Sequence, residues 1–402
     1  MFSRNGLVQA GMRVGIIGGG PGGSVTAAAL ARRGHSVIVW ERERFPRFHI
    51  GESLLPCNLP IFQDLGLDIA AFQAQNFIAK QGAFFEQAGT GQTVRFPFAA
   101  GLPGDPPGIY QVERSRFDAF LLDHAVASGA ELRCPMVVER VDFTTAQPVV
   151  HTADSAATVV DMVVDASGRD TLLARQHGSI DRLGDLKRAA VFGHVGALPL
   201  APGAHPGDIV ISRAVGGWSW QIPLAADKWS VGLVLKREAV ESGGTPDEVF
   251  RAHLHLFPEV AARLAGQVPK PVRSIPNISY RVGARYGANW ALVGDAGGFI
   301  DPIFSSGVLL ATRAGWRLAQ ALDSGTALSE WATMTDQDLA TFVAFIRLWY
   351  DGHFIDTLFF GGVRAPDITQ GITSLLGGNT THGENVFVAM LKRRMQSTNR
   401  SV

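Results

Sequence analysis

The 402-residue sequence predicts an α/β fold that begins with a Rossmann-like nucleotide-binding unit. Three observations predict it: an N-terminal strand, glycine turn, helix and strand; a central block of short β-like runs; and a helical C-terminal end. A chain of this length exceeds what one core usually supports, so we expect two cooperating substructures. Residues 1–325 form the nucleotide-binding module, with an antiparallel sheet at about 189–280, and residues 326–402 form a short helical cap.

The first element is the run "MRVGII" at 12–17, which predicts a buried strand. The helix "SVTAAALARRG" follows and ends at Gly34, and "HSVIVWE" supplies the next strand. A strand, a helix and a strand within about thirty residues indicate a parallel pair with a right-handed crossover.

The turn between that strand and helix carries Gly18, Gly20 and Gly23 in the pattern G-x-G-x-x-G. Glycines there let the backbone approach a pyrophosphate at the helix N-terminus. Glu41 closes the second strand roughly twenty residues further on, where a carboxylate accepts hydrogen bonds from an adenosine ribose. The alternative is a glycine turn without a ligand.

Hydrophobic patterns also predict the later helices and strands. "RSRFDAFLLDHAVASGAEL" has the spacing of an amphipathic helix, and "VVDMVVDASGRD" indicates a buried strand that enters a turn. Short β-like runs from Ala189 to Leu235 predict an antiparallel sheet over one face of a ligand site. Beyond about Gly325 the pattern is helical.

Charge and cysteine content limit the expected binding partners and the expected cellular compartment. Lys+Arg 36 and Asp+Glu 36 cancel, which argues against nucleic acid or an anionic membrane surface as a partner and favours small molecules. Cys57 and Cys134 are too few for a disulfide framework or a cysteine metal site, so we expect no metal and a reducing cytoplasm. No apolar run is long enough for a membrane span, and the first eleven residues do not resemble a secretory signal.

A second glycine turn, "GDAGGF" at 294–299, favours FAD over a nicotinamide as the predicted cofactor. A nicotinamide enzyme needs only the first turn, whereas FAD proteins reuse a late segment to hold the ribityl and phosphate groups. Asp295 is the candidate to bind a hydroxyl there; the alternative role is a helix N-cap, and one residue can serve as both.

The segment "GIIGGGPGGSVTAAALARRGHSVIVWERERFPRFHIGESLLP" resembles the N-terminus of the flavin-dependent halogenases, a branch of the p-hydroxybenzoate hydroxylase-like FAD monooxygenases. "VERSRFDAFLL" is similar to the family's next signature. The resemblance implies a GR2-type FAD-binding fold in which Arg114 approaches the phosphate or ribityl region and Ser53 also contacts the cofactor. Both stretches are also similar to hydroxylases and geranylgeranyl reductases, so they imply FAD and the fold only.

Three later features are specific to halogenases. "WSWQIP" at 218–223 matches the family's W-x-W-x-I-P motif, and "FIDPIFSSG" at 299–307 matches F-x-x-P-x-x-S-x-G. "IAKQGAFF" places Lys80 where the phenol- and pyrrole-type members carry a catalytic lysine. The resemblance covers most of residues 12–320 and becomes weaker beyond them.

The resemblance implies the reaction. A separate flavin reductase supplies FADH2, and halide and O2 give hypohalous acid at the flavin. The N–H groups of Ser306 and Gly307 would hold chloride or bromide in a backbone nest. Lys80 would meet the hypohalous acid beyond an internal passage, as a hydrogen-bond donor or as a haloamine, and an electron-rich aromatic ring would be halogenated.

Trp218 and Trp220 stand two residues apart on a predicted strand, so both indoles face the same side. We expect them to form a wall that keeps the aromatic substrate from the flavin; the alternative is that they only fill a sheet core. The competing function is a flavin-dependent hydroxylase or another FAD oxidoreductase of this fold. A hydroxylase must bring the ring to the flavin, so a wall favours the halogenase.

The substrate is expected to be phenolic or pyrrolic, either free or tethered to an acyl or peptidyl carrier protein. "LKRRMQ" at 391–396 is a candidate contact for an acidic carrier, or simply a solvated helix end. The sequence does not choose a substrate base among four candidates: Asp351, His353, Asp356 and His382.

Overall fold

The computed structural model describes residues 11–178, 180–241, 244–275, 279–352, 355–362, 364–381 and 383–399. One half of the molecule is built on a five-stranded sheet in the order β19-β11-β1-β2-β7, and every pair in it is parallel. The strands are β1 (Arg13–Ile17), β2 (Ser36–Trp40), β7 (Glu131–Arg133), β11 (Met162–Asp165) and β19 (Trp290–Leu292). The predicted parallel βαβ unit is confirmed.

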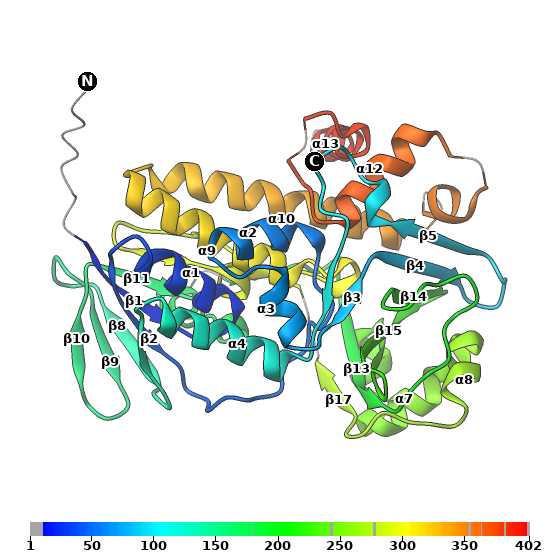
Figure 1. Cartoon of the computed structure of the whole chain (residues 1–402), viewed down its shortest axis with the longest axis horizontal. Coiled ribbons are helices and arrows are strands. Elements are labelled where there is room, and N and C mark those ends of the chain that lie inside the picture. Colours follow the sequence, from blue (N-terminus) through cyan, green and yellow to red (C-terminus); the bar gives the residue numbers. More distant parts are fainter. Residues whose placement is uncertain are drawn as a thin grey trace.

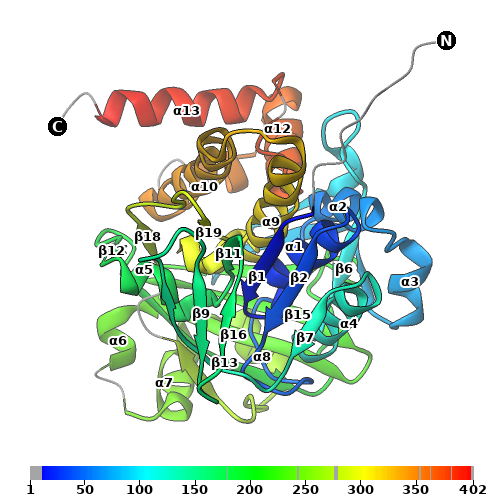
Figure 2. The same ribbon diagram turned by 90° about the vertical axis from the view of Figure 1, so that its left-hand side faces the viewer.

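Layers of helix and strand cover this sheet on its two faces (Figure 1, Figure 2). One layer holds α1 (Pro21–Ala31), which packs against both α4 (Arg114–Ala127) and α9 (Gly307–Ser324). The other is an antiparallel ribbon of β8 (Val138–Asp142), β9 (Val149–Thr152) and β10 (Ala157–Val159). Apolar side chains of β1 and β2 meet that ribbon in a shared core.

A seven-stranded sheet forms the second half, in the order β17-β13-β16-β15-β14-β4-β5. Its strands are β17 (Arg273–Ile275), β13 (Arg188–Val195), β16 (Lys228–Lys236), β15 (Gly217–Ala225), β14 (Ile209–Ala214), β4 (Gly82–Gln87) and β5 (Thr93–Pro97). The pairs are antiparallel except β14 with β4. The predicted sheet is therefore present, but it is wider than residues 189–280 because β4 and β5 extend its edge. Helices α6 (Arg237–Glu241), α7 (Pro246–His253) and α8 (Pro258–Leu264) cover its outer face.

Smaller elements join the two halves. β3 (Ile78–Lys80) pairs with β6 (Ile109–Gln111) beside β15, and β12 (Ile180–Arg182) pairs with β18 (Tyr280–Val282), which pairs with β20 (Gly298–Phe299). The short helices are α2 (Leu59–Asp64), α3 (Ile69–Ala74) and α5 (Leu172–Gln176).

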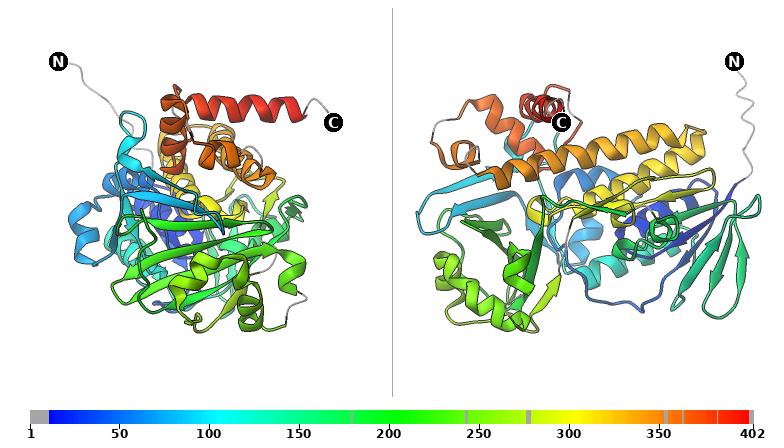
Figure 3. Two further views of the ribbon diagram at one scale, coloured as in Figure 1. Left: turned by 90° about the vertical axis from the view of Figure 1, so that its right-hand side faces the viewer. Right: turned by 180° about the vertical axis from the view of Figure 1, so that it is seen from behind.

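The C-terminal end is helical, as predicted: α10 (Leu328–Asp351), a π-helical turn (Asp356–Phe360), α12 (Pro366–Leu376) and α13 (Val386–Asn399) lie together along one side of the molecule (Figure 3). The aromatic rings of Trp349 and Phe359 pack against Phe85 of β4. The C-terminal helices thus share the main core. No helix within the described residues has the length and hydropathy to span a bilayer.

Candidate functional site

A cavity of about 590 Å³ lies between the parallel sheet and the seven-stranded sheet. Nine of the predicted site residues line it: Gly18, Gly20, Glu41, Ser53, Arg114, Trp218, Trp220, Asp295 and Gly307. Gly23, Lys80 and Ser306 do not line it. Residues scattered through the sequence thus converge on one site.

The first glycine turn is shaped for close backbone approach. Gly18 has φ +103°, and a Cβ built there would lie 2.4 Å from the Ala166 carbonyl oxygen. A Cβ on Gly23 would lie 1.9 Å from the Gly18 carbonyl oxygen, so Gly23 lets helix α1 pack on the turn and does not face the cavity. Gly20 is the N-cap of α1 and borders the open space.

Glu41 is buried at the end of β2, and backbone N–H groups hold its carboxylate. Its Oε2 accepts from the Gly19 N–H at 2.7 Å, and its Oε1 accepts from the Glu43 N–H at 2.8 Å. These bonds fix an acceptor on the cavity wall beside the glycine turn, in the position expected of a ribose ligand.

Two arginines share one buried carboxylate. Arg114 donates to both oxygens of Asp118, at 2.7 and 2.9 Å, and to the Ile50 carbonyl at 2.6 Å. Arg47 donates to Asp118 at 3.2 Å and lies 3.6 Å from a Cβ built on Gly20. Sequence reasoning missed Arg47, although it stands in the quoted N-terminal segment; its position beside the phosphate-type turn makes it a second cation for an anionic ligand.

Asp295 lies in a 3₁₀ turn, Gly294–Gly297, at the other side of the cavity. Burial raises the pKa of its carboxyl to about 6, while Arg169 and Arg114 oppose the rise. The N-cap residue of that turn is Val293, so the capping alternative for Asp295 is wrong.

Several buried polar atoms near the cavity have no hydrogen-bond partner among the described residues. They are Ser53 Oγ, Ser306 Oγ and Glu52 Oε2. Buried polar groups in folded proteins are nearly always paired, so such atoms suit a polar ligand. Together with the glycine turn, the two cations and Glu41, they fit a dinucleotide such as FAD.

The segment from Asp301 to Gly307, which we call the S-x-G turn, approaches the cavity at the N-terminus of α9. Ser305 adopts a left-handed conformation with φ +55°, Ser306 is the N-cap, and Gly307 begins the helix. The first N–H groups of a helix have no intrahelical acceptor and carry partial positive charge. The predicted anion nest therefore has suitable geometry at Gly307, while the hydroxyl of Ser306 is buried and has no hydrogen-bond partner in the part of the chain that the structure describes.

Trp218 and Trp220 lie on one face of β15 with ring centroids 5.8 Å apart. Their exposed fractions are 2% and 5%, and both rings, with Ile222, line the cavity. Trp220 packs on Phe192 of β13. The pair thus forms one continuous indole surface in the cavity wall.

Lys80 is buried behind the cavity lining, with an exposed fraction of 1%. Its Nζ donates to the Leu54 carbonyl at 2.8 Å and lies 5.3 Å from the centroid of the Phe98 ring. Burial lowers the pKa of its ammonium from 10.5 to about 7, with Asp208 opposing the shift. Ser53 lines the cavity, and the carbonyl of the next residue, Leu54, accepts the hydrogen bond from Lys80. The segment Ser53–Leu54 therefore connects the cavity with the environment of Lys80.

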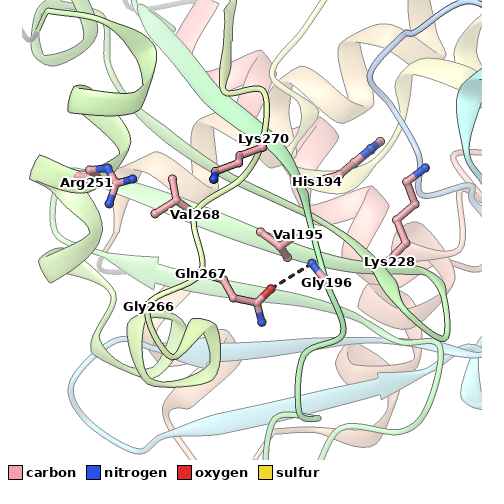
Figure 4. Close-up of a pocket in the computed structure, with 9 residues that line it drawn as sticks. All are labelled: His194, Val195, Gly196, Lys228, Arg251, Gly266, Gln267, Val268 and Lys270. Carbon is pink, nitrogen blue, oxygen red and sulfur yellow. Dashed lines mark hydrogen bonds between the residues drawn. The ribbon is translucent and has the colours of Figure 1, made fainter.

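A second pocket of about 460 Å³ opens where β13 ends and β16 begins (Figure 4). Its cationic side chains are Lys228, Arg251 and Lys270, and His194 also lines it. His194 Nε2 also contacts Glu52 Oε1 at 2.7 Å, which places this pocket next to the main cavity. None of the predicted site residues lines this pocket. Sequence reasoning missed the contact between His194 and Glu52 because 142 positions separate the two residues.

The four candidates for a substrate base receive little support. Asp351 pairs with Arg394 and Asp356 pairs with Arg213, and both carboxylates are exposed. Neither lines the cavity. His353 and His382 lie outside the described residues.

Comparison with known proteins agrees with this site. The sequence matches the tryptophan halogenase family over residues 13–105 and 108–387, further toward the C-terminus than residue 320, where we expected the resemblance to weaken. A 1H-pyrrole-2-carbonyl-(peptidyl-carrier protein) chlorinase of Pseudomonas fluorescens is 30% identical and aligns with 93% of this chain and 90% of its own. A tryptophan 2-halogenase of Chondromyces crocatus is 31% identical over 85% of this chain, which spans only 65% of that relative.

Among solved structures, the flavin-dependent brominase Bmp2 superposes with a TM-score of 0.86 and 26% identity, covering 97% of this chain and all of its own. The FAD-binding fold is thereby confirmed. Members of this family use FAD, halide and O2. The chain belongs to the family of flavin-dependent halogenases.

Proposed function

We propose that this protein is a FADH2-dependent halogenase that acts on a pyrrolic or phenolic ring carried as a thioester on an acyl or peptidyl carrier protein. The observation that carries the proposal is the placement of Lys80. A buried amine with a pKa near 7 bonds to the Leu54 carbonyl, next to the cavity-lining Ser53, but does not itself line the cavity. A neutral or easily deprotonated amine suits reaction with hypohalous acid.

The cofactor roles follow from the cavity. FAD would place its pyrophosphate at Gly18 and Gly20 with Arg47 and Arg114 nearby, and its adenosine ribose at Glu41. Asp295 and Ser53 would hold the remaining hydroxyl and ring atoms. When bound, reduced FAD supplies the electrons that activate O2.

The remaining proposed roles are halide binding and exclusion of the aromatic substrate from the flavin. The N–H groups of Ser306 and Gly307 would bind chloride or bromide at the start of α9, where the helix dipole favours an anion. Trp218 and Trp220 would exclude the aromatic ring and admit only the small oxidant. This arrangement supports the halogenase over the hydroxylase, which needs its substrate against the flavin.

The tethered substrate is supported by similarity along nearly the whole length of the pyrrole-carrier chlorinase. The exposed Lys392, Arg393 and Arg394 on α13 offer a surface for an acidic carrier. Both cysteines are unpaired, in keeping with a reducing cytoplasm where a flavin reductase operates.

The test combines the protein with a flavin reductase, FAD, chloride or bromide, and matched substrates: pyrrole-2-carboxylate or a phenolic acid, each free and carrier-bound. Mass spectrometry should show halogenated carrier-bound product, and Lys80→Ala should abolish it while FAD binding persists. Efficient turnover of the free acids would contradict tethering. Hydroxylated product formed without halide would contradict the halogenase itself.

A further inference from the structure

Hydrogen bonds connect the first indole of the wall to the S-x-G turn. The Trp218 Nε1–H donates to the Tyr350 hydroxyl at 2.9 Å, and that hydroxyl donates to Asp301 Oδ2 at 2.6 Å. Asp301 Oδ1 accepts from the Ile303 N–H at 3.1 Å and so caps the 3₁₀ turn Pro302–Phe304. One path of three bonds thus runs from the wall to the residues just before Ser305.

The groups on this path are held firmly. Asp301 has an exposed fraction of 0%, and the Arg188 guanidinium lies 4.2 Å from the centroid of the Tyr350 ring. Burial raises the pKa of Tyr350 well above its usual 10, so the hydroxyl keeps the proton that it donates. Burial also raises the pKa of Asp301 to about 6, with the bond from Tyr350 opposing, so the carboxylate is mostly ionised at neutral pH.

The second indole is anchored differently. The Trp220 Nε1–H donates to Ser230 Oγ at 3.0 Å, inside the same sheet. Only Trp218 depends on α10, which supplies Tyr350, and on the S-x-G turn. A purely structural need to satisfy an indole N–H could be met within the sheet, as Trp220 shows.

We propose that Tyr350 and Asp301 are positioning residues that hold the Trp218 indole and the S-x-G turn as one unit, so that the wall is closed where the halide binds. The inference rests on the proposed function in taking this turn as the halide site. It adds a contribution from the C-terminal helices to a site otherwise built by the two sheets.

The test compares Tyr350→Phe, which keeps the ring but removes both bonds, with Ser230→Ala, which removes the acceptor of the other indole. Tyr350→Phe should raise the halide KM about fivefold, which corresponds to about 1 kcal/mol, and should change kcat at saturating halide by less than twofold. Free hypohalous acid, trapped by monochlorodimedone, should rise relative to product. Ser230→Ala should leave the halide KM unchanged.

A second readout needs no cofactor. Two indoles 5.8 Å apart should give an exciton couplet in the circular dichroism of the FAD-free protein, which Trp218→Phe abolishes. Tyr350→Phe should reduce this couplet, and Tyr286→Phe, at a half-exposed tyrosine elsewhere, should not. If Tyr350→Phe fails to fold, Asp301→Asn replaces it with the same expectations, because the amide cannot supply acceptors for both Tyr350 and Ile303.

An unchanged couplet together with an unchanged halide KM would overturn the proposal, and so would an equal rise of the halide KM in Ser230→Ala. If the wild-type protein halogenates no substrate, the proposed function fails. The couplet then tests only whether Tyr350 positions the Trp218 indole. A reduced couplet in Tyr350→Phe supports that role, and an unchanged couplet refutes it.

Discussion

Lys80 illustrates how position changes the chemistry of a residue type. An exposed lysine stays protonated at neutral pH, but burial brings the pKa of this amine to about 7. Within the described residues, its Nζ donates a hydrogen bond to the Leu54 carbonyl and to no other group. The protein therefore maintains a poorly compensated ionisable group in its core, as functional sites often do.

Replacing Lys80 by Met should stabilise the fold. The folded pKa lies below the unfolded value of 10.5, so the unfolded chain binds more protons between pH 7 and pH 10.5 and wild-type stability rises with pH there. The gain from Lys80→Met should be greatest below pH 7, on the order of a few kcal/mol, and should shrink toward pH 10.

Urea unfolding at pH 6, 8 and 9.5 measures this dependence, with exposed Lys236→Met as the control. A stability gain that is the same at all three pH values would contradict the shifted pKa. The measurement needs neither FAD nor substrate.

Sequence reasoning found the groups whose roles depend on local pattern. Gly18, Gly20 and Glu41 are spaced by a single βαβ unit, and the two tryptophans by a single strand. It missed the partners made by tertiary contact. Asp301 and Tyr350 are 49 positions apart, and neither has a local signal that predicts the other.

Strand β16 supports the wall from behind. Gly232 pairs with Trp220 across the β15–β16 ladder, and a Cβ built on it would lie 2.3 Å from the Trp220 ring and 2.7 Å from Phe192 Cβ. The Trp220 ring therefore occupies the space that the Cβ of any residue other than glycine at position 232 would fill. Glycine is required here by packing against a ring.

Gly232→Ala should displace the Trp220 ring and open the wall. Overpacking should also cost about 1–3 kcal/mol of unfolding free energy. Gly193→Ala is the matched control, because its Cβ would meet the Pro271 carbonyl oxygen at 2.5 Å in the same sheet without contacting the indoles.

Both variants should unfold at lower urea concentration, but only Gly232→Ala should release more trapped hypohalous acid per product formed. Equal release by the two variants would show that the wall does not depend on this packing.

The parallel strands and helices α1, α4 and α9 were predictable because apolar runs and glycine turns mark them locally. The width of the second sheet was not. β4 and β5 come from residues 82–97, and β4 joins β14 in parallel only because the intervening chain crosses the molecule. Such a pairing depends on the whole topology.

At the scale of the molecule, the cavity is a joint product of both sheets. Its lining runs from Ile17 in β1 to Ala311 in α9 and includes the β15 wall. A ligand that contacts all these segments is bound by the folded state only. Ligand binding should therefore stabilise the entire fold, not one half of it.

FAD should raise the free energy of unfolding by about 2.7 kcal/mol at a free concentration one hundred times its Kd. Arg47→Met should weaken FAD binding about tenfold and reduce that gain by roughly 1.4 kcal/mol at the same concentration, because a cation beside the glycine turn is lost. Arg116→Met is the control: this arginine is exposed on α4, donates to the Gln75 carbonyl and does not line the cavity. Titration by flavin fluorescence and thermal unfolding with and without FAD measure both quantities. If Arg47→Met binds FAD as tightly as Arg116→Met does, Arg47 serves only to neutralise Asp118, and the pyrophosphate relies on backbone N–H groups and Arg114 alone.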